Sequence, residues 1–307
     1  HDLQQQIDAE LLNRCGTPRL PIVFGDPAAD RARLKLGAEV YAARCQQCHG
    51  VNGDGTGAAA EYLSPKPRDY TQGIFKFTST PYGVKPRRSD LLQTLRRGVT
   101  GTSMPSFDDL SPEELEAVVD YVIFLSQRGE LQSELVIMAQ DDEELDPAYI
   151  DETVAGIVER WHEAQSKLVM PLTPMPAFTE ETIAKGHELF LKQACNKCHG
   201  ANGRGGSMGD VEIGKDSWGN SAAAADLPSG MFRGGGRPVD IYRRIHSGIN
   251  GTPMPAFSEV FAKEPDDVWY LVHFIRDTGE RRRRNLPPLD DSTATPSPSM
   301  APPAPAD

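Results

Sequence analysis

The chain has 307 residues, a net charge of −12 and 38% hydrophobic residues, and this length predicts two domains with a connector. It contains no run of about 18 apolar residues, which excludes an evident transmembrane helix, and no basic face or motif supports nucleic-acid binding. The negative charge is uneven: residues 131–180 carry a net charge of −9, whereas residues 30–130 sum to zero.

The chain opens with an N-terminal extension, residues 1–29. It shows no signal-peptide pattern, so we expect a mature or trimmed sequence. The first strong helical pattern follows over residues 31–44, where Gly37 and Tyr41 lie four residues apart and therefore on one helix face. Residues 180–194 repeat this pattern with Gly186 and Phe190.

Each of these helices ends in the same pentapeptide pattern, C-x-x-C-H, and the two copies lie 150 residues apart. This pattern is the attachment signature of c-type haem. Two thiols bond to one porphyrin, and the adjacent histidine reaches the iron as the proximal ligand. A single copy could be a zinc half-site, but two copies, each followed by a similar Met-Pro loop, favour two covalently attached haem c groups. The predicted residues are Cys45, Cys48, His49, Cys195, Cys198 and His199.

Two further loops, residues 101–105 and 251–255, share the pattern Gly-Thr-x-Met-Pro and also lie 150 residues apart. Met104 and Met254 each follow their histidine by 55 residues. The proline after each methionine favours an extended backbone, so we predict Met104 and Met254 as the distal iron ligands. A methionine is otherwise usually a core residue, and Met208 and Met231 are rival ligands in the second copy.

The remaining elements complete a duplicated, mostly α fold. Short helices are predicted over 89–97 and 239–247. A final helix begins at Ser111-Pro112 with Glu114 completing a capping box, and its counterpart begins at Pro265. Two haem domains follow, residues 30–130 and 179–285.

The connector, residues 131–178, is acidic and helical. Asp146-Pro147 opens a helix with an apolar stripe that includes Ile150, Ile157 and Trp161. We expect this helix to pack between the domains with a solvated acidic face; the run 141–144 is alternatively a docking surface for a basic redox partner. The Pro/Ala/Ser-rich tail, residues 286–307, is predicted to be disordered.

Two features have several readings. Cys15 is the one cysteine outside the haem motifs. The leading interpretation is a small hydrophobic residue buried in a core, followed by an intermolecular disulfide partner and, third, a distal haem ligand. Eight arginines lie near the Met loops. They are interpreted as partners of the haem propionates or as residues around a docking face; alternatively, most of them are solvated surface residues. They are Arg87, Arg88, Arg96, Arg97, Arg233, Arg237, Arg243 and Arg244.

The order of helix, C-x-x-C-H, Met loop and final helix resembles the class I c-type cytochrome family, and the whole chain resembles its two-domain dihaem members. The resemblance covers residues 31–130 and 179–280. It implies that Gly37 and Tyr41 pack against Tyr121, and Gly186 and Phe190 against Phe274. It also implies a proline carbonyl, Pro65 or Pro67, as the acceptor for His49, whereas the second domain departs from this pattern.

The resemblance implies an exported, periplasmic protein. Association with a membrane, through a native anchor absent from this sequence, is an alternative that stays open. Two filled axial positions favour an electron carrier over an enzyme. We therefore expect electron transfer between redox protein partners, with the donor and acceptor unknown. The alternatives are a fixed subunit of a respiratory complex feeding a terminal oxidase, and a catalytic dihaem enzyme such as a peroxidase or a sulfur-compound dehydrogenase.

Overall fold

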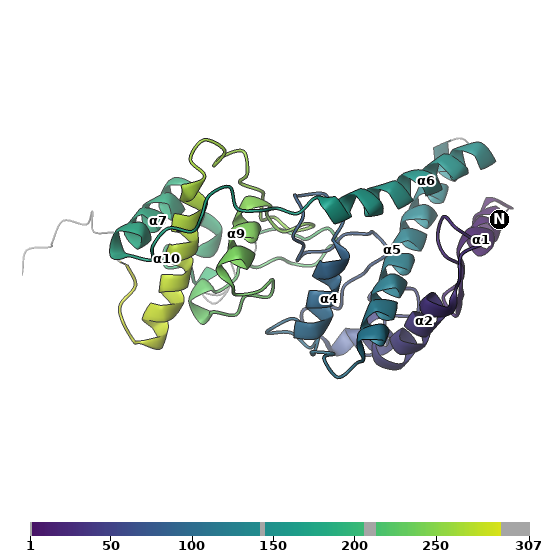
Figure 1. Cartoon of the computed structure of the whole chain (residues 1–307), viewed down its shortest axis with the longest axis horizontal. Coiled ribbons are helices and arrows are strands. Elements are labelled where there is room, and N and C mark those ends of the chain that lie inside the picture. The colour runs from purple at the N-terminus through teal and green to yellow at the C-terminus, as the bar shows by residue number, and fades with distance from the viewer. Residues whose placement is uncertain (1, 142–144, 206–212, 290–307) are drawn as a thin grey trace, which may run out of the picture.

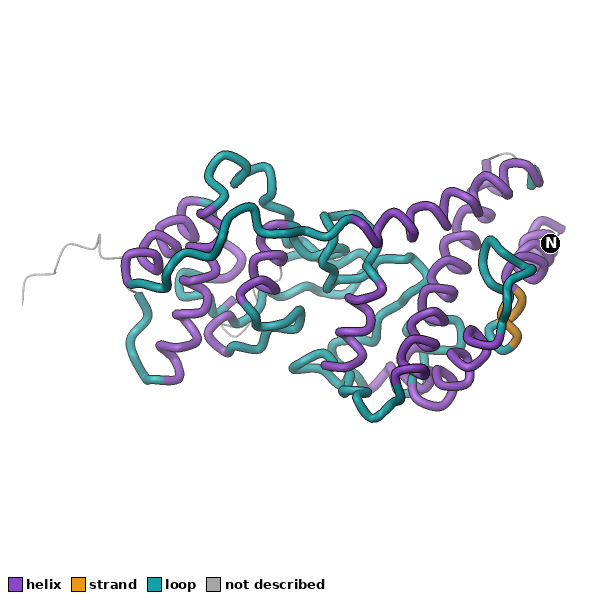
Figure 2. Tube along the Cα trace, viewed as in Figure 1, coloured by secondary structure: helices purple, strands orange, loops and turns teal. Residues whose placement is uncertain are grey.

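The computed structural model describes residues 2–141, 145–205 and 213–289. Over these residues the chain is elongated, and its helices form two bodies that follow one another along the long axis (Figure 1). The strands in the described part are β1 (Gly16–Thr17) and β2 (Leu20–Pro21), which pair antiparallel. Figure 2 shows helices and long loops elsewhere. The mostly α fold class is confirmed.

The first domain is organised by the crossing of α2 (Ala32–Arg44) and α5 (Pro112–Asp141). A Cβ on Gly37 would overlap the carbonyl oxygen of Ala117, so only glycine permits this close approach. Beside it, the rings of Tyr41 and Tyr121 lie 5.1 Å apart. The helix α3 (Gln46–His49), the 3-10 turn η1 (Ala60–Tyr62) and α4 (Arg88–Arg97) complete the domain.

The second domain repeats this crossing with α7 (Glu180–Lys192) and α10 (Asp266–Arg283). A Cβ on Gly186 would overlap the carbonyl oxygen of Tyr270, and the rings of Phe190 and Phe274 lie 5.0 Å apart. The predicted glycine–aromatic contact is therefore confirmed in both domains. The helix α8 (Asn196–His199), the 3-10 turn η4 (Leu227–Ser229) and α9 (Pro238–His246) complete this domain.

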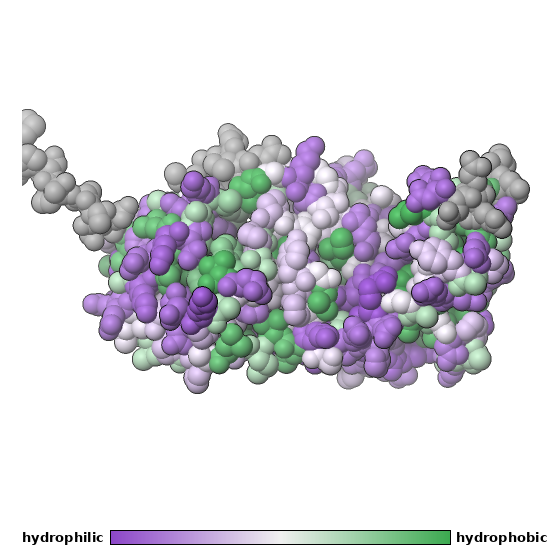
Figure 3. Space-filling view, turned by 90° about the horizontal axis from the view of Figure 1, so that it is seen from above, coloured by the Kyte–Doolittle hydropathy of each residue, from purple (hydrophilic) through white to green (hydrophobic). Residues whose placement is uncertain are grey.

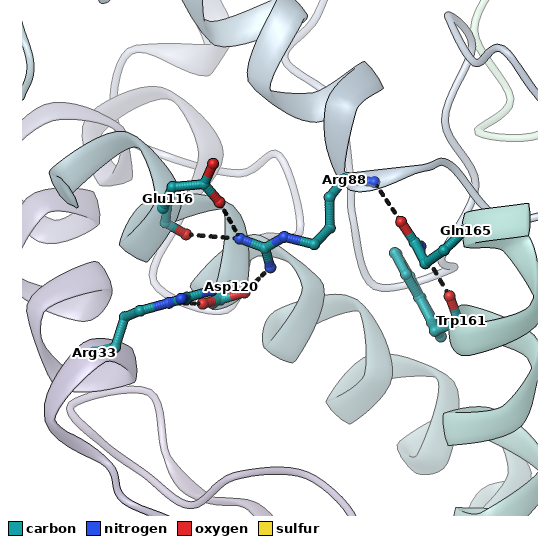
Figure 4. A network of polar contacts seen from close by, with 6 residues as sticks. All are labelled: Arg33, Arg88, Glu116, Asp120, Trp161 and Gln165. Carbon is teal, nitrogen blue, oxygen red and sulfur yellow. Dashed lines mark hydrogen bonds and ion pairs between the residues drawn. The ribbon is translucent and has the colours of Figure 1, made fainter. Parts of the chain in front are cut away.

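Capping and one charged network fix the helices of the first domain. The amide of Ser111 donates to Glu114 at 2.8 Å and the amide of Glu114 donates to the Ser111 hydroxyl at 3.2 Å, which is the predicted capping box. Figure 4 shows Arg88 of α4 reaching Glu116 and Asp120 on α5, while Arg33 of α2 also contacts Asp120. Three helices are thus joined through one carboxylate.

The connector packs on the first domain. The helix α5 is continuous over 30 residues, so the predicted domain boundary at residue 130 falls inside it. The helix α6 (Pro147–Glu163) folds back on α5, and Trp161 donates to Glu130 at 2.8 Å. Ile150 and Ile157 are fully buried in the first core, and burying each contributes about 1.5–3 kcal/mol. The expectation that this helix lies between the domains is wrong, because its apolar stripe is covered by the second half of α5.

The N-terminal extension joins the same layer. The helix α1 (Asp2–Cys15) packs on α5 through Ile7 and Leu11, and Arg14 forms an ion pair with Asp151 of α6 at 2.5 Å. The first core therefore extends beyond α2, α4 and α5 to include α1 and α6.

After η2 (Ala164–Ser166) the chain runs as an extended strap toward α7, drawn in teal in Figure 1. The amide of Val169 donates to the Ser79 carbonyl at 2.8 Å, and Trp269 donates to the Thr173 carbonyl at 2.9 Å. The strap therefore bonds first to one domain and then to the other. Most of the predicted disordered tail (290–307) and three residues of the acidic run (142–144) lie outside the described residues.

Candidate functional site

Each C-x-x-C-H sequence forms a single helical turn directly after the first helix of its domain. The amides of Cys48 and His49 donate to the Cys45 carbonyl at 3.1 and 3.0 Å. In the second domain, Cys198 and His199 donate to the Cys195 carbonyl at 3.3 and 3.0 Å. One turn thus carries both thiols and the imidazole, which is the arrangement that attachment to a single porphyrin requires.

The imidazole of each motif histidine is held by a backbone carbonyl. The Nδ1 of His49 lies 3.0 Å from the carbonyl oxygen of Arg68, and the Nδ1 of His199 lies 3.3 Å from that of Ala225. A carbonyl only accepts, so Nδ1 carries the proton and the lone pair of Nε2 is available for a metal. The suggested acceptors Pro65 and Pro67 are wrong, because the chain presents the Arg68 carbonyl instead.

The two acceptors are equivalent positions of the repeat. Arg68-Asp69 and Ala225-Asp226 match in the aligned halves, and both precede the residue that packs over the histidine loop. A backbone carbonyl accepts this hydrogen bond whichever side chain its residue carries, so the residue type at this position can differ between the two domains. A proline at a fixed position is therefore not needed for this bond.

The surroundings of the two histidines differ. His49 is buried, and its ring stacks on Tyr70 at 4.7 Å, with Phe75 stacked behind Tyr70 at 5.9 Å. His199 is partly exposed, and its nearest ring is Phe190, at 6.4 Å and tilted. Burial lowers the pKa of both histidines, against the opposing effect of the carbonyl hydrogen bonds. Both imidazoles are therefore neutral at pH 7, as metal ligands must be.

The two Met loops have the same backbone bonds. Val99 donates to the Met104 carbonyl at 3.1 Å, and Ile249 donates to the Met254 carbonyl at 3.2 Å. The amides of the two methionines donate to the hydroxyls of Thr102 and Thr252 at 3.2 and 3.3 Å.

Both methionines are partly buried, and Met104 packs on the first core. Of the rivals, Met208 lies outside the described residues. Met231 is 53% exposed, and a Cβ on Gly101 of the first domain would lie 3.4 Å from its sulfur. The ligand roles of Met104 and Met254 stay predictions.

The domain interface engages several of the arginines noted in the sequence. Arg244 of α9 donates to the carbonyls of Lys76, at 3.2 Å, and Thr78 in the first domain. Arg97 of α4 donates across the interface to the carbonyl of Arg233 at 3.3 Å. Arg96, Arg233 and Arg237 are exposed. The interpretation that most of the eight arginines are solvated is wrong, because five of them bond to other parts of the protein: Arg87, Arg88, Arg97, Arg243 and Arg244.

Three buried nitrogen donors near this interface lack a protein acceptor within the described part of the chain. They are Trp218 Nε1, Arg97 Nε and Arg244 Nε. Burying a donor without an acceptor costs about 1–3 kcal/mol, so these groups point to acceptors that the protein does not supply. The propionate carboxylates of haem are such acceptors. Together with the motif turns and the free Nε2 atoms, these donors fit haem c, which supplies one-electron redox chemistry when bound.

The surface adds two facts. No helix of the described chain is both long and apolar enough to cross a membrane. Figure 3, seen from above, shows apolar side chains in small groups separated by hydrophilic ones. Exposed Met170 and Leu172 belong to the strap, and this face does not by itself define a docking surface.

Cys15 is fully buried in the first core, as its leading interpretation requires. Burial raises the pKa of its thiol to about 12. A neutral thiol in an apolar core is inert.

Comparisons with known proteins agree with this geometry. Residues 32–122 match the family model described as cytochrome c oxidase, cbb3-type, subunit III, and residues 183–279 match the model described as cytochrome c. A solved chain of the Kuenenia stuttgartiensis reducing HAO-like protein complex is similar, with 31% identity and a TM-score of 0.62, over 80% of this chain and 96% of that chain. No curated protein matches.

The chain belongs to the class I c-type cytochrome family, with two cytochrome c domains in tandem. Such domains bind haem c covalently and transfer electrons.

Proposed function

We propose that the chain is a dihaem cytochrome that passes electrons through two His/Met-ligated haems, as the electron-transfer subunit of a larger redox complex. The observation that carries the proposal is the duplicated histidine clamp. In each domain a backbone carbonyl holds Nδ1 of the motif histidine and leaves Nε2 for iron, and each domain carries a Met loop with the same backbone bonds. With both axial positions filled, each iron exchanges electrons without bonding a substrate.

The similarity to a chain of the reducing HAO-like protein complex supports a bound subunit over a freely diffusing carrier. The likeness extends across both domains, since it covers 80% of this chain. We propose an exported location for the same reason that applies to haem c in general, since haem is attached to c-type cytochromes outside the cytoplasm. Co-purification from native cells, followed by identification of the partner, tests the bound subunit. Recovery of the chain alone at native concentration contradicts it.

Ligation is tested on the holoprotein. A haem-to-protein ratio of two is expected, with a weak sulfur-to-iron absorption band in the near-infrared from both ferric haems. Met104→Ala should remove about half of this band and leave the second haem unchanged, and Met254→Ala should remove the other half. Bis-histidine or high-spin spectra from either domain in the unmodified protein contradict the proposal.

The rival function is a catalytic dihaem enzyme. Such an enzyme needs an iron that binds a substrate or a small ligand. If both axial positions are filled, as we propose, added carbon monoxide should bind the unmodified reduced protein slowly and weakly. It should bind the Met104→Ala variant at one haem. Fast stoichiometric binding to the unmodified protein favours the enzyme.

A further inference from the structure

A hairpin of the second domain touches both candidate haem sites. It spans residues 213–222 and is called the Trp218 hairpin below. Ile213 donates to the Ala222 carbonyl at 3.2 Å and Ala222 donates to the Gly214 carbonyl at 2.8 Å. At its tip the carboxylate of Asp216 accepts from the amides of Trp218 and Asn220, at 3.1 and 2.9 Å. These bonds give the tip a defined shape.

One side of the Trp218 hairpin holds the loop that carries Met254. The amide of Ser217 donates to the Gly251 carbonyl at 3.0 Å. The Trp218 ring lies against Gly251, where an added Cβ would come within 2.7 Å of two ring carbons. Gly251 is three residues before Met254, so the position of this loop depends on the hairpin.

The other side of the hairpin is held by the first domain. The guanidinium carbon of Arg68 lies 3.6 Å from the centre of the Trp218 ring, which is a close stacked cation–π contact. Lys76 forms an ion pair with Asp216 at 2.9 Å, and the Asp216 side chain is only 6% exposed. Burial lowers the pKa of Arg68 to about 10, which leaves it charged at pH 7.

Arg68 is also the residue whose carbonyl holds His49. Its backbone therefore orients the proximal histidine of the first domain while its side chain stacks on Trp218. A comparison of the two halves of the repeat shows that this loop is longer in the second domain. His199 and its acceptor are 26 residues apart, whereas His49 and its acceptor are 19 apart. The Trp218 hairpin lies within this longer loop.

We propose that the Arg68–Trp218 stack is a positioning link that joins the proximal histidine of the first haem site to the Met254 loop of the second. This inference rests on the proposed two-haem function and adds to it. A firm hydrogen bond from Nδ1 makes the imidazole a stronger donor to iron, and a stronger donor favours ferric over ferrous iron. A residue of the second domain thus tunes the reduction potential in the first.

The test measures both reduction potentials of the holoprotein in Trp218→Ala and Arg68→Lys variants. Arg68→Lys keeps the charge but loses the planar stacking surface, so it removes the stack without a Coulombic change. In both variants the ratio of reduced to oxidised first haem, at a fixed poise, should rise about threefold. The first haem is assigned with a Met104→His variant, because replacing the methionine ligand lowers the potential of that haem alone.

The double variant makes the test specific to the link. If Arg68 and Trp218 act through one contact, its shift should not exceed the larger single shift, because coupled residues are not additive. Trp218→Phe is the matched control: it keeps a stacking face and removes Nε1, so a stack-mediated effect is largely preserved. It also remains informative if Trp218→Ala fails to fold. Arg96→Ala, an exposed arginine near the Met104 loop, controls for general charge effects.

Unchanged first-haem potentials in Trp218→Ala and Arg68→Lys overturn the link, as do additive shifts in the double variant. A full shift in Trp218→Phe overturns the stack and assigns the effect to the Nε1 donor. These outcomes leave the haem count and both near-infrared bands intact. Failure of the proposed function is distinguishable, because it appears in the unmodified protein as a missing haem or a missing band.

Discussion

The two domains share one backbone plan but surround their histidines differently. In the first, His49 is buried behind Tyr70 and Phe75, and the hydroxyl of Tyr41 donates to the Gly50 carbonyl at 2.9 Å. In the second, Leu227 stands at the position of Tyr70 and Phe190 at that of Tyr41. The parts that duplication preserved are therefore backbone bonds and glycine contacts, whereas the side chains that cover the histidines have diverged.

The lengths of two loops also differ, and both differences fall at the domain interface. The second domain has seven more residues between the histidine and its acceptor, and these carry the Trp218 hairpin. The first domain has a longer segment between Gly73 and Asp90 than the second has between Gly230 and Asp240. From this segment Gly83 donates to Asn250 at 2.9 Å, and Lys76 pairs with Asp216. Each domain uses its extra residues to hold the other.

The largest effect is expected where the two domains are alike. Gly37→Ala and Gly186→Ala each place a Cβ against a backbone carbonyl at the helix crossing, and the helices have to separate. We expect about 3 kcal/mol of destabilisation in the altered domain, at the upper end for overpacking. Thermal unfolding, followed at the haem absorption of each domain, measures it.

Gly156→Ala is the control for these variants, since its added Cβ would meet nothing closer than 3.6 Å. It should leave stability unchanged or raise it slightly. If Gly37→Ala unfolds both domains together, the expectation that the loss is confined to the altered domain is contradicted.

A second variant makes the first domain resemble the second. Tyr70→Leu introduces the residue found at position 227 and removes the stack on His49. The expected loss is about 2 kcal/mol, from aromatic pairing and lost packing. Urea unfolding of the first domain measures it, with Tyr62→Leu as an exposed control. A loss below about 0.5 kcal/mol would show that the stack contributes little to the first domain.

The repeat made much of this arrangement predictable. The helix crossings at Gly37 and Gly186, the capping box at Ser111 and the burial of Cys15 all follow from local patterns or from the resemblance. At each of these positions the residue type fits one structural role much better than any other. An example is a glycine where two helices touch.

Other features had no local signal. The carbonyls of Arg68 and Ala225 act through the backbone, so side-chain chemistry does not reveal them. The packing of α6 on α5 depends on the continuation of α5 to Asp141, which the sequence presents as the start of a connector. The Trp218 stack is a contact between two domains, and only the change in offset between the halves hinted at an unusual loop there.

The third prediction concerns the order of reduction. Burial disfavours the extra charge of ferric iron, so the more enclosed haem should have the higher potential. His49 is 8% exposed behind Tyr70, while His199 is partly open to solvent. The shorter Nδ1 hydrogen bond of His49, 3.0 Å against 3.3 Å for His199, acts in the opposite direction. We expect burial to outweigh it, so that the first-domain haem is reduced first, by about tenfold in the equilibrium ratio, which is about 59 mV for a one-electron couple. Stepwise titration with Met104→His to assign the steps decides the order, and prior reduction of the second haem contradicts it.

The smallest effect concerns the pH dependence of the interface. Burial alone would raise the pKa of Asp216, but hydrogen bonds from Lys76 and from the amides of Asn220 and Trp218, with the charge of Lys76, hold it below its usual value. A carboxyl whose pKa is lower in the folded state contributes stability above its unfolded pKa of about 3.9, and this is lost as pH falls through the folded pKa.

The contribution of Asp216 should therefore be complete at pH 6 and decline progressively below about pH 4, as the pH falls toward the lowered pKa of the folded state. Asp216→Asn keeps an acceptor for the backbone amides but removes the ion pair with Lys76. We expect it to cost about 1 kcal/mol at pH 6 and progressively less below pH 4, so that the stability curves of variant and parent converge. Thermal unfolding of both proteins between pH 6 and pH 3 measures the difference. Because other carboxyls titrate equally in the two proteins, a constant gap across this range would mean that the Lys76–Asp216 pair does not stabilise the interface.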